Sequence, residues 1–416
     1  MKSLRQTCKG ARQAGFTLIE IMIALLIGLI GIVVMMQTFA VSEGFKRTAT
    51  SGTDAQINGG VAMYMIQREL RMAGYAMNDL MVQGCSSVRV WNNSAGFGID
   101  MPLVPFYINP PLVPAGDANT DTILIAYGTS NSAVASIPVL TNQANNNSIP
   151  LASNWDTFQT GDVFVSYQPT STNPSCVLHE VTAATNPSGN CLAVPTSALS
   201  GGYTSSSVEF GTSNYQQHTP SGCVTTTPTY NKATAITDSG GTAVPMLTYP
   251  NGKVFNLGNA AIHVYAVRGG VLTLCDWVAS DCRSAANYTP VVDDIVSLRA
   301  VYGMNLTPAA SASVGDLKTI TWNRNDLSTN VFLPSRVLAV ALEVTARSGL
   351  KEKPNAAGNC VTTPNANKPD LSQAWQYDGT AGANIDLSAV STDWACYRYK
   401  LFQTQVPLRN TIWRPE

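Results

Sequence analysis

A single carboxylate lies inside the most apolar stretch of this chain. Between Phe16 and Val41 the one charged residue is Glu20, about one helical turn into the stretch. In a membrane, a carboxylate there costs roughly 2.5 kcal/mol or more unless a partner meets it. A cationic amino terminus is a suitable partner. The chemistry to explain is therefore that of Glu20 and of the residues just before it.

The elements around Glu20 are those of a membrane anchor. Residues 16–41 are long enough, at about 1.5 Å per residue, for a helix to cross a hydrocarbon layer of about 30 Å. The preceding leader, residues 1–15, has no acid and four cations, Lys2, Arg5, Lys9 and Arg12. This charge places the amino terminus in the cytoplasm and everything after about residue 42 on the other side of the membrane.

The leader and the apolar stretch meet at Gly15-Phe16-Thr17-Leu18-Ile19-Glu20. This junction resembles the class III signal of type IV prepilins. The resemblance implies that a prepilin peptidase cleaves between Gly15 and Phe16, on the cytoplasmic side, and methylates the new amino group of Phe16. It also implies that Glu20 meets the amino terminus of a neighbouring subunit and so fixes the axial register of assembly. The alternative is a plain single-pass anchor whose Glu20 extends toward the membrane interface.

The helix is expected to continue beyond the membrane through residues 42–75. Met63, Ile66, Leu70 and Ala73 recur at spacings of three and four, which predicts one apolar face packed on a sheet. Gly74 is a suitable stop for this helix.

Residues 76–416 consist of short apolar runs separated by Gly, Pro, Asn and Ser, which predicts a β-rich periplasmic or extracellular domain. We expect strands at residues 121–127, 162–167, 176–182, 261–267, 271–275, 337–346 and 397–406, and a helical turn leading into a strand over 291–302. Polar insertions are expected at about 141–154, 183–230 and 361–391. The predicted class is α+β: a long N-terminal helix, membrane-spanning in its first half, packed on an antiparallel β-sheet with loop insertions.

Several segments of the body also resemble the PilW family of minor pilins. They are residues 68–75, 121–128, 292–303, 337–348 and 397–410. The resemblance implies a subunit that initiates or caps a type IV pilus within a tip complex of minor pilins. The implied partners are the prepilin peptidase, other minor pilins, the major pilin and the inner-membrane assembly machinery. The implied location is the inner membrane first, and then the pilus or its tip at the cell surface.

Cysteine usage predicts disulfides on the exported side. Removing the leader removes Cys8 and leaves an even number of cysteines, which suggests disulfide pairing. Proximity in the sequence favours three pairs and leaves a fourth: Cys275 with Cys282, Cys176 with Cys191, Cys360 with Cys396, and Cys85 with Cys223. Free buried thiols are the alternative.

Composition argues against an enzyme or a nucleic-acid binder. Charged residues are 12% of the chain, about half of the ~25% usual in soluble domains, and the formal net charge is -1. The three histidines stand in no catalytic pattern, and His179 alternates with Val177 and Val181 as a sheet residue should. Asp117-Ala-Asn-Thr-Asp121 begins like a calcium loop but lacks its later residues, so we expect a turn. We predict no catalytic site, no cofactor, no metal and no nucleic-acid partner.

Two further functions remain open from the sequence. A pseudopilin of a type II secretion system has the same N-terminal logic. A pilus-tip adhesin or DNA-uptake subunit would use the polar insertions as its binding surface.

Overall fold

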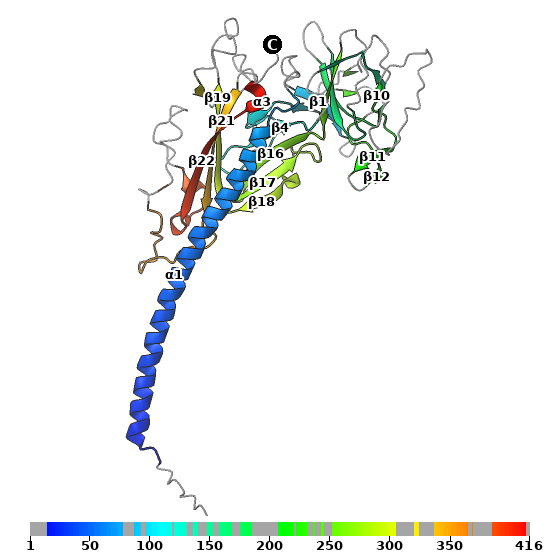
Figure 1. Cartoon of the computed structure of the whole chain (residues 1–416). Helices are drawn as coiled ribbons and strands as arrows, with labels where there is room; N and C mark the ends of the chain where they lie inside the picture. Colours follow the sequence, from blue (N-terminus) through cyan, green and yellow to red (C-terminus); the bar gives the residue numbers. More distant parts are fainter. Residues whose placement is uncertain are drawn as a thin grey trace, which may run out of the picture.

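The computed structural model describes residues 15–77, 87–92, 97–118, 120–130, 136–139, 148–152, 158–168, 175–184, 207–219, 222–231, 236–237, 243–244, 252–304, 320–323, 337–364, 368 and 385–412. Over these residues it confirms the α+β class: a long N-terminal helix followed by sheets that are mostly antiparallel. One half of the helix lies against the β-rich body and the other half projects from it (Figure 1).

The helix α1 (Leu18–Met72) is continuous over 55 residues. It therefore includes both the apolar stretch and the expected second stripe. Thr17 caps its start, and after the C-cap Ala73 the backbone turns at Gly74, whose φ of +79° is in the left-handed region that glycine adopts readily.

The strands are β1 (Ser87–Asn92), β2 (Phe97–Pro102), β3 (Phe106–Ile108), β4 (Ile123–Tyr127), β5 (Ile137–Pro138), β6 (Ser148–Pro150), β7 (Val163–Gln168), β8 (Ser175–Glu180), β9 (Ala183–Ala184), β10 (Ser207–Glu209), β11 (Tyr215–Thr219), β12 (Gly222–Thr226), β13 (Ile236–Thr237), β14 (Ala243–Val244), β15 (Lys253–Gly258), β16 (Ala261–Arg268), β17 (Val271–Asp276), β18 (Thr289–Asp293), β19 (Ile295–Met304), β20 (Thr321–Asn323), β21 (Val337–Arg347) and β22 (Tyr399–Pro407). The short helices are η1 (Ala285–Asn287), η5 (Leu387–Ala389), η6 (Trp394–Cys396) and α3 (Arg409–Ile412). All seven segments that were expected to be strands are strands.

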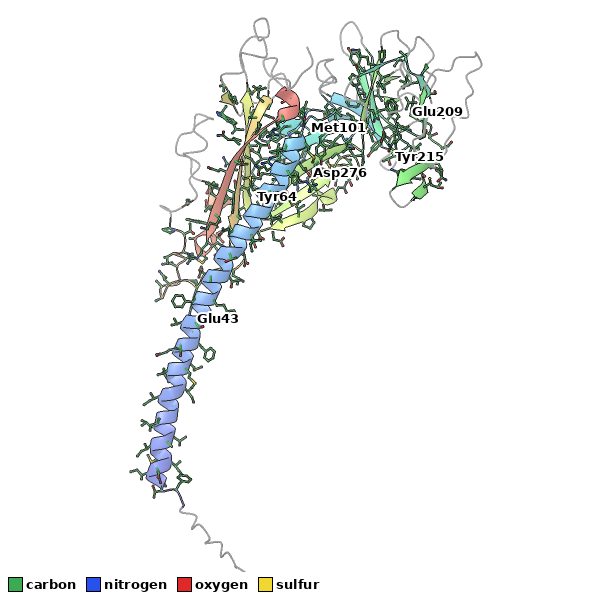
Figure 2. The ribbon with its side chains drawn as sticks, in the orientation of Figure 1. Glu43, Tyr64, Met101, Glu209, Tyr215 and Asp276 are labelled. Carbon is green, nitrogen blue, oxygen red and sulfur yellow. A yellow bond between two sulfur atoms is a disulfide. The ribbon has the colours of Figure 1, made fainter. Side chains whose placement is uncertain are left out.

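Two antiparallel sheets receive the second half of α1. One has the strand order β20-β19-β21-β22 and the other β18-β17-β16-β4-β3. The helix contacts β21 and β22 of the first sheet and β18 and β4 of the second. Figure 2 shows the difference along the helix: side chains around Glu43 point into open space, whereas at Tyr64 the helix lies against the body.

The described chain between β4 and β16 forms most of a second lobe. β4 and β16 are nevertheless direct neighbours in the sheet β18-β17-β16-β4-β3, with Tyr127 opposite Ala261. The main sheet of the second lobe has the order β2-β1-β8-β7-β15-β5, so β1 and β2 join it from outside the insertion. The lobe has a small core of its own, which includes Phe158, Phe164, Val208, Phe210 and Val254.

Small residues let α1 approach the first sheet closely. Ala55, Gly59 and Ala62 are buried on the sheet-facing side. At Gly59 a Cβ atom would lie 2.1 Å from Cε2 of Phe402 on β22, so only glycine fits without displacing that ring. Further along the helix Ile66 and Leu70 are fully buried, each contributing roughly 1.5–3 kcal/mol of apolar burial.

The expected helical turn within residues 291–302 is wrong. The chain there forms β18 and β19, joined at Asp294 with a φ of +60°. The Asp294 carboxylate accepts a hydrogen bond from Arg347 Nε at 3.1 Å. The apolar pattern was ambiguous because β19 is buried on both faces, so it lacks the alternation that marks a half-buried strand.

The outer face of the first sheet is covered as well. Ile385 and Leu387, at the end of the expected insertion 361–391, are buried against Val301 and Ala341. The same face of β21 holds Glu343, which is fully buried and accepts hydrogen bonds from Ser297 and Thr345. Burial raises the pKa of Glu343 to about 7, although these two hydrogen bonds oppose the rise.

An ion pair joins α1 to the second sheet. Glu69 Oε1 on α1 lies 2.8 Å from Nδ1 of His263 on β16. Burial by itself lowers the pKa of His263, but the hydrogen bond and charge of Glu69, with the charge of Asp276, raise it above the ordinary value. The protonated imidazole is therefore more favoured in the folded chain than in the unfolded chain.

The close contact at Gly59 predicts opposite effects for two adjacent glycines. Gly59→Ala forces the Phe402 ring to move and should destabilise the chain by about 1–3 kcal/mol. Gly60→Ala has open space around its Cβ and should stabilise α1 by up to about 1 kcal/mol. Urea unfolding of the full chain in detergent measures both. Equal effects of the two substitutions would contradict this packing.

The Glu69–His263 pair predicts a pH-dependent stability. A raised histidine pKa contributes stability that is complete below the unfolded value of about 6.5 and is lost as pH rises through the folded value. The destabilisation by Glu69→Gln should therefore be larger at pH 6 than at pH 9, by on the order of 1 kcal/mol.

The matched control is Glu352→Gln, which removes a carboxylate paired with Arg398, a cation that keeps its charge over this range. Its effect in the same unfolding experiment should be the same at pH 6 and pH 9. A pH-independent effect of Glu69→Gln would show that His263 does not carry the charge.

Candidate processing and assembly site

The amino-terminal end of α1 forms a capping box. Thr17, in extended conformation, is the N-cap, and its Oγ1 accepts a hydrogen bond from the Glu20 backbone N–H at 3.3 Å. In return Glu20 Oε2 accepts from the Thr17 backbone N–H at 3.3 Å and from Thr17 Oγ1 at 3.3 Å. This reciprocal arrangement satisfies amides that the first turn leaves without partners, and the carboxylate also favours the positive end of the helix dipole.

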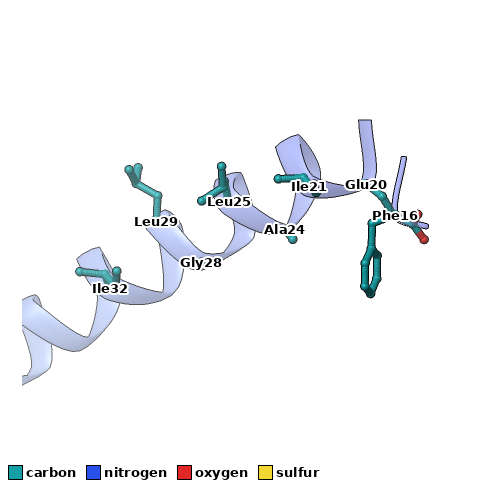
Figure 3. A pocket seen from close by; sticks show the side chains of 8 residues that line it. All are labelled: Phe16, Glu20, Ile21, Ala24, Leu25, Gly28, Leu29 and Ile32. Atoms are coloured by element: carbon teal, nitrogen blue, oxygen red, sulfur yellow. The ribbon is translucent and has the colours of Figure 1, made fainter. Parts of the chain in front are cut away.

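The expected cleavage point lies just outside the helix. Gly15 and Phe16 precede α1, are not helical and are exposed, with Phe16 81% exposed. A peptidase needs an accessible, non-helical backbone at the bond it cuts, and the Gly15–Phe16 bond has both properties. Figure 3 places Phe16 beside Glu20, so an amino group created at Phe16 would lie close to that carboxylate.

The helix beyond Glu20 presents an apolar surface with a shallow groove. The groove is lined by Phe16, Glu20, Ile21, Ala24, Leu25, Gly28, Leu29 and Ile32 (Figure 3). Residues Leu18–Lys46 form a helix long and apolar enough to cross a membrane. The apolar side chains of this span are not buried by any other part of the described chain. They therefore need lipid or other apolar helices around them.

Gly15, Phe16 and Glu20 are expected from the sequence, and the structure adds Thr17 as the helix cap. The signal was present, because Thr17 followed three residues later by Glu20 is the pattern of a capping box. The Glu69–His263 pair had no such signal, since its partners are 194 residues apart.

Cysteines in the described part of the chain form disulfides. Cys275 is bonded to Cys282 with a Cα–Cα distance of 5.8 Å, and Cys360 to Cys396 with 4.7 Å. Cys176 and Cys223 are also disulfide-bonded. Cys191 and Cys85, the partners that we expect for them, lie outside the described residues.

Other polar residues that the sequence singled out have structural roles. The Asp117 carboxylate accepts hydrogen bonds from the Gly269 and Gly270 backbone N–H groups, at 2.9 and 2.8 Å, and so holds the β16–β17 hairpin. His179 is buried on β8 with its Nε2 3.1 Å from Ser166 Oγ, and burial lowers its pKa to about 3. In the described residues no three His, Cys, Asp or Glu side chains are grouped as metal ligands.

The comparisons with known proteins agree with the geometry of this site. A family described as the prokaryotic N-terminal methylation motif matches residues 10–36, which contain the expected cleavage point and Glu20. No curated protein and no solved structure matches the chain. The motif implies processing by a prepilin peptidase and contact with pilus assembly machinery, and the apolar helix fits membrane anchoring. The chain carries the N-terminal methylation motif of a type IV pilin-like or pseudopilin protein, and this motif suggests a structural protein.

Proposed function

We propose that this protein is a minor pilin of the PilW type, which takes part in initiating or capping a type IV pilus within a tip complex. The observation that carries the proposal is the arrangement at the start of α1. The Gly15–Phe16 bond is exposed, Thr17 caps the helix, and Glu20 lies beside Phe16, the residue that would become the amino terminus. The matched methylation motif supports the pilin-like class. The resemblance of the body segments to PilW proteins supports the finer assignment.

The second lobe supports a terminal rather than a shaft position. It is inserted between β4 and β16 and lies away from the half of α1, Leu18–Lys46, that projects from the body (Figure 1). A large side lobe is easier to accommodate at the end of a filament than between stacked subunits. The proposed partners are other minor pilins, the major pilin and the inner-membrane assembly machinery, and the proposed final location is the pilus tip.

The type II pseudopilin is the second candidate, because the methylation motif is common to both classes. A deletion strain separates them. Loss of piliation and twitching with normal protein secretion supports the minor pilin, and loss of secretion with normal pili supports the pseudopilin. Normal piliation in this strain, when deletion of another minor pilin abolishes it, would refute the proposed function.

Processing is predicted to depend on Gly15. Coexpression with a prepilin peptidase should yield a chain that begins at N-methyl-Phe16, and Gly15→Val should block cleavage because a branched side chain obstructs the scissile bond. Intact mass and N-terminal sequencing measure both. Gly10→Val, in the same leader, is the matched control and should be cleaved normally. Retention of Met1 in the unaltered chain, or cleavage near Ala40, would contradict the pilin-like class.

Two substitutions should separate the capping role of Glu20 from its charge. Glu20→Gln can keep the capping box but removes the negative charge, whereas Thr17→Val removes the cap but keeps the charge. If Glu20 pairs with the amino terminus of a neighbour, Glu20→Gln should lower incorporation into sheared pili roughly tenfold or more, since a charged hydrogen bond contributes about 1.5–3 kcal/mol.

Thr17→Val should reduce incorporation far less, because a helix cap contributes about 1 kcal/mol. Immunoblots of the pilus fraction, normalised to the membrane pool of the same variant, give the comparison. Equal losses in both variants would show that Glu20 acts only as a cap.

A further inference from the structure

A short segment covers the outer face of the first sheet. Residues 385–396, the strap, contain the turns η5 and η6, and the strap side chains Ile385 and Leu387 are buried against Val301 and Ala341. The side chains of β21 that alternate with Ala341 belong to the core beneath α1. The strap therefore lies on the face of the sheet opposite the helix.

The two ends of the strap are held in different ways. At its carboxyl end, Cys396 is bonded to Cys360, and the Cys396 carbonyl accepts a hydrogen bond from the Glu352 backbone N–H at 2.8 Å. In residues 385–391 the backbone hydrogen bonds within the described chain stay inside the strap. The contact between this part and the sheet in the described chain is that of the two apolar side chains. The strap is thus fixed at one end and able to lift at the other.

Glu343 lies on the covered face of β21. It is two residues from Ala341, which packs against the strap, so both side chains are on the same face of the sheet. On the other side of Glu343, Thr345 lies opposite Leu401 of β22, which packs against the same covered cluster. Glu343 itself is fully buried. The carboxyl therefore has the strap-covered cluster on both sides.

The groups around Glu343 suit a neutral carboxyl. The Ser297 and Thr345 hydroxyls hydrogen-bond to its two oxygens, and a protonated carboxyl can donate to one hydroxyl while it accepts from the other. Of the charged groups near it, Arg299, directly opposite on β19, lowers the pKa of Glu343, and Asp121 raises it. Burial outweighs the lowering contributions and raises the pKa to about 7.

The strap brings no positive group to this carboxyl. Its sequence contains no Lys, Arg or His, and of its two acids Asp393 is paired with Lys351 and Asp386 is exposed. On β22 the residue opposite Glu343 is the uncharged Gln403. Ionising Glu343 beneath the closed strap therefore costs more free energy than ionising it with the strap lifted, when water reaches the carboxylate.

We propose that the strap is a pH-dependent cover of the first sheet, closed while Glu343 holds a proton and lifted at residues 385–391 when that carboxyl ionises. The proton passes to water, and the disulfide keeps the lifted strap attached. An uncovered glutamate has its ordinary pKa of about 4.3, so the closed form binds a proton that the open form releases. Lifting is therefore favoured as pH rises toward about 7 and gains nothing further above that value. The pH thereby sets whether the apolar outer face of the sheet is covered.

Hydrogen–deuterium exchange of the full chain in detergent, at about pH 5.5 and about pH 7.5, tests this proposal. After correction for the chemical exchange rate at each pH, the protection of amides 387–391 should be about tenfold or more lower at the higher pH. The Glu352 and Thr363 amides, which donate to carbonyls at the fixed end of the strap, should keep their protection. In Glu343→Gln, whose neutral amide resembles the protonated carboxyl, the protection of amides 387–391 should be the same at both pH values.

The matched control is Glu180→Gln in the second lobe. It neutralises another buried glutamate whose pKa is raised by burial, and it should leave the pH response of the strap intact. Equal protection of amides 387–391 at the two pH values in the unaltered chain would overturn the proposal, and this comparison needs no variant. A pH response that persists in Glu343→Gln would also overturn it, because another group would then control the strap.

Discussion

The structure depends on one helix that must satisfy two environments. The second half of α1 buries Ala55, Ile66 and Leu70 against sheets of its own chain. The first half, Leu18–Lys46, is not buried against the described body, and its side chains are exposed. Each large apolar side chain of this kind gains roughly 1.5–3 kcal/mol when it is removed from water. Lipid or neighbouring helices must supply that burial.

The body is organised to hold the other half of α1 rigidly. Small residues at Ala55, Gly59 and Ala62 bring the helix against β21 and β22, and the Glu69–His263 pair fixes it to β16. Because β4 and β16 are direct neighbours, the second lobe can be inserted between them without disturbing the sheet that contacts the helix. A rigid helix thus connects the membrane end of the molecule to a lobe that lies away from it.

Glu20 can serve both the isolated subunit and the assembled one. In the isolated chain it caps its own helix through hydrogen bonds of 3.3 Å to exposed groups, an interaction of about 1 kcal/mol. Leaving a carboxylate without a partner in lipid costs more, roughly 2.5 kcal/mol or above. In the proposed assembly, a cationic amino terminus from a neighbour would offer Glu20 a charged partner in the membrane, and a Thr17 cap lost in that exchange would be a small cost by comparison.

Local sequence determined the helix, the junction at Gly15–Phe16, the isolated charge of Glu20 and seven of the described strands, because period, length and turn residues report how each segment is buried. It also indicated the short-range Cys275–Cys282 pair. Only the tertiary structure decided that β4 pairs with β16 across an inserted lobe, that Glu69 meets His263, and that residues 291–302 contain no helical turn but the end of β18 and a strand, β19, buried on both faces. Periodicity shows that a face is buried and leaves open what covers it, since the covering residues come from distant parts of the chain.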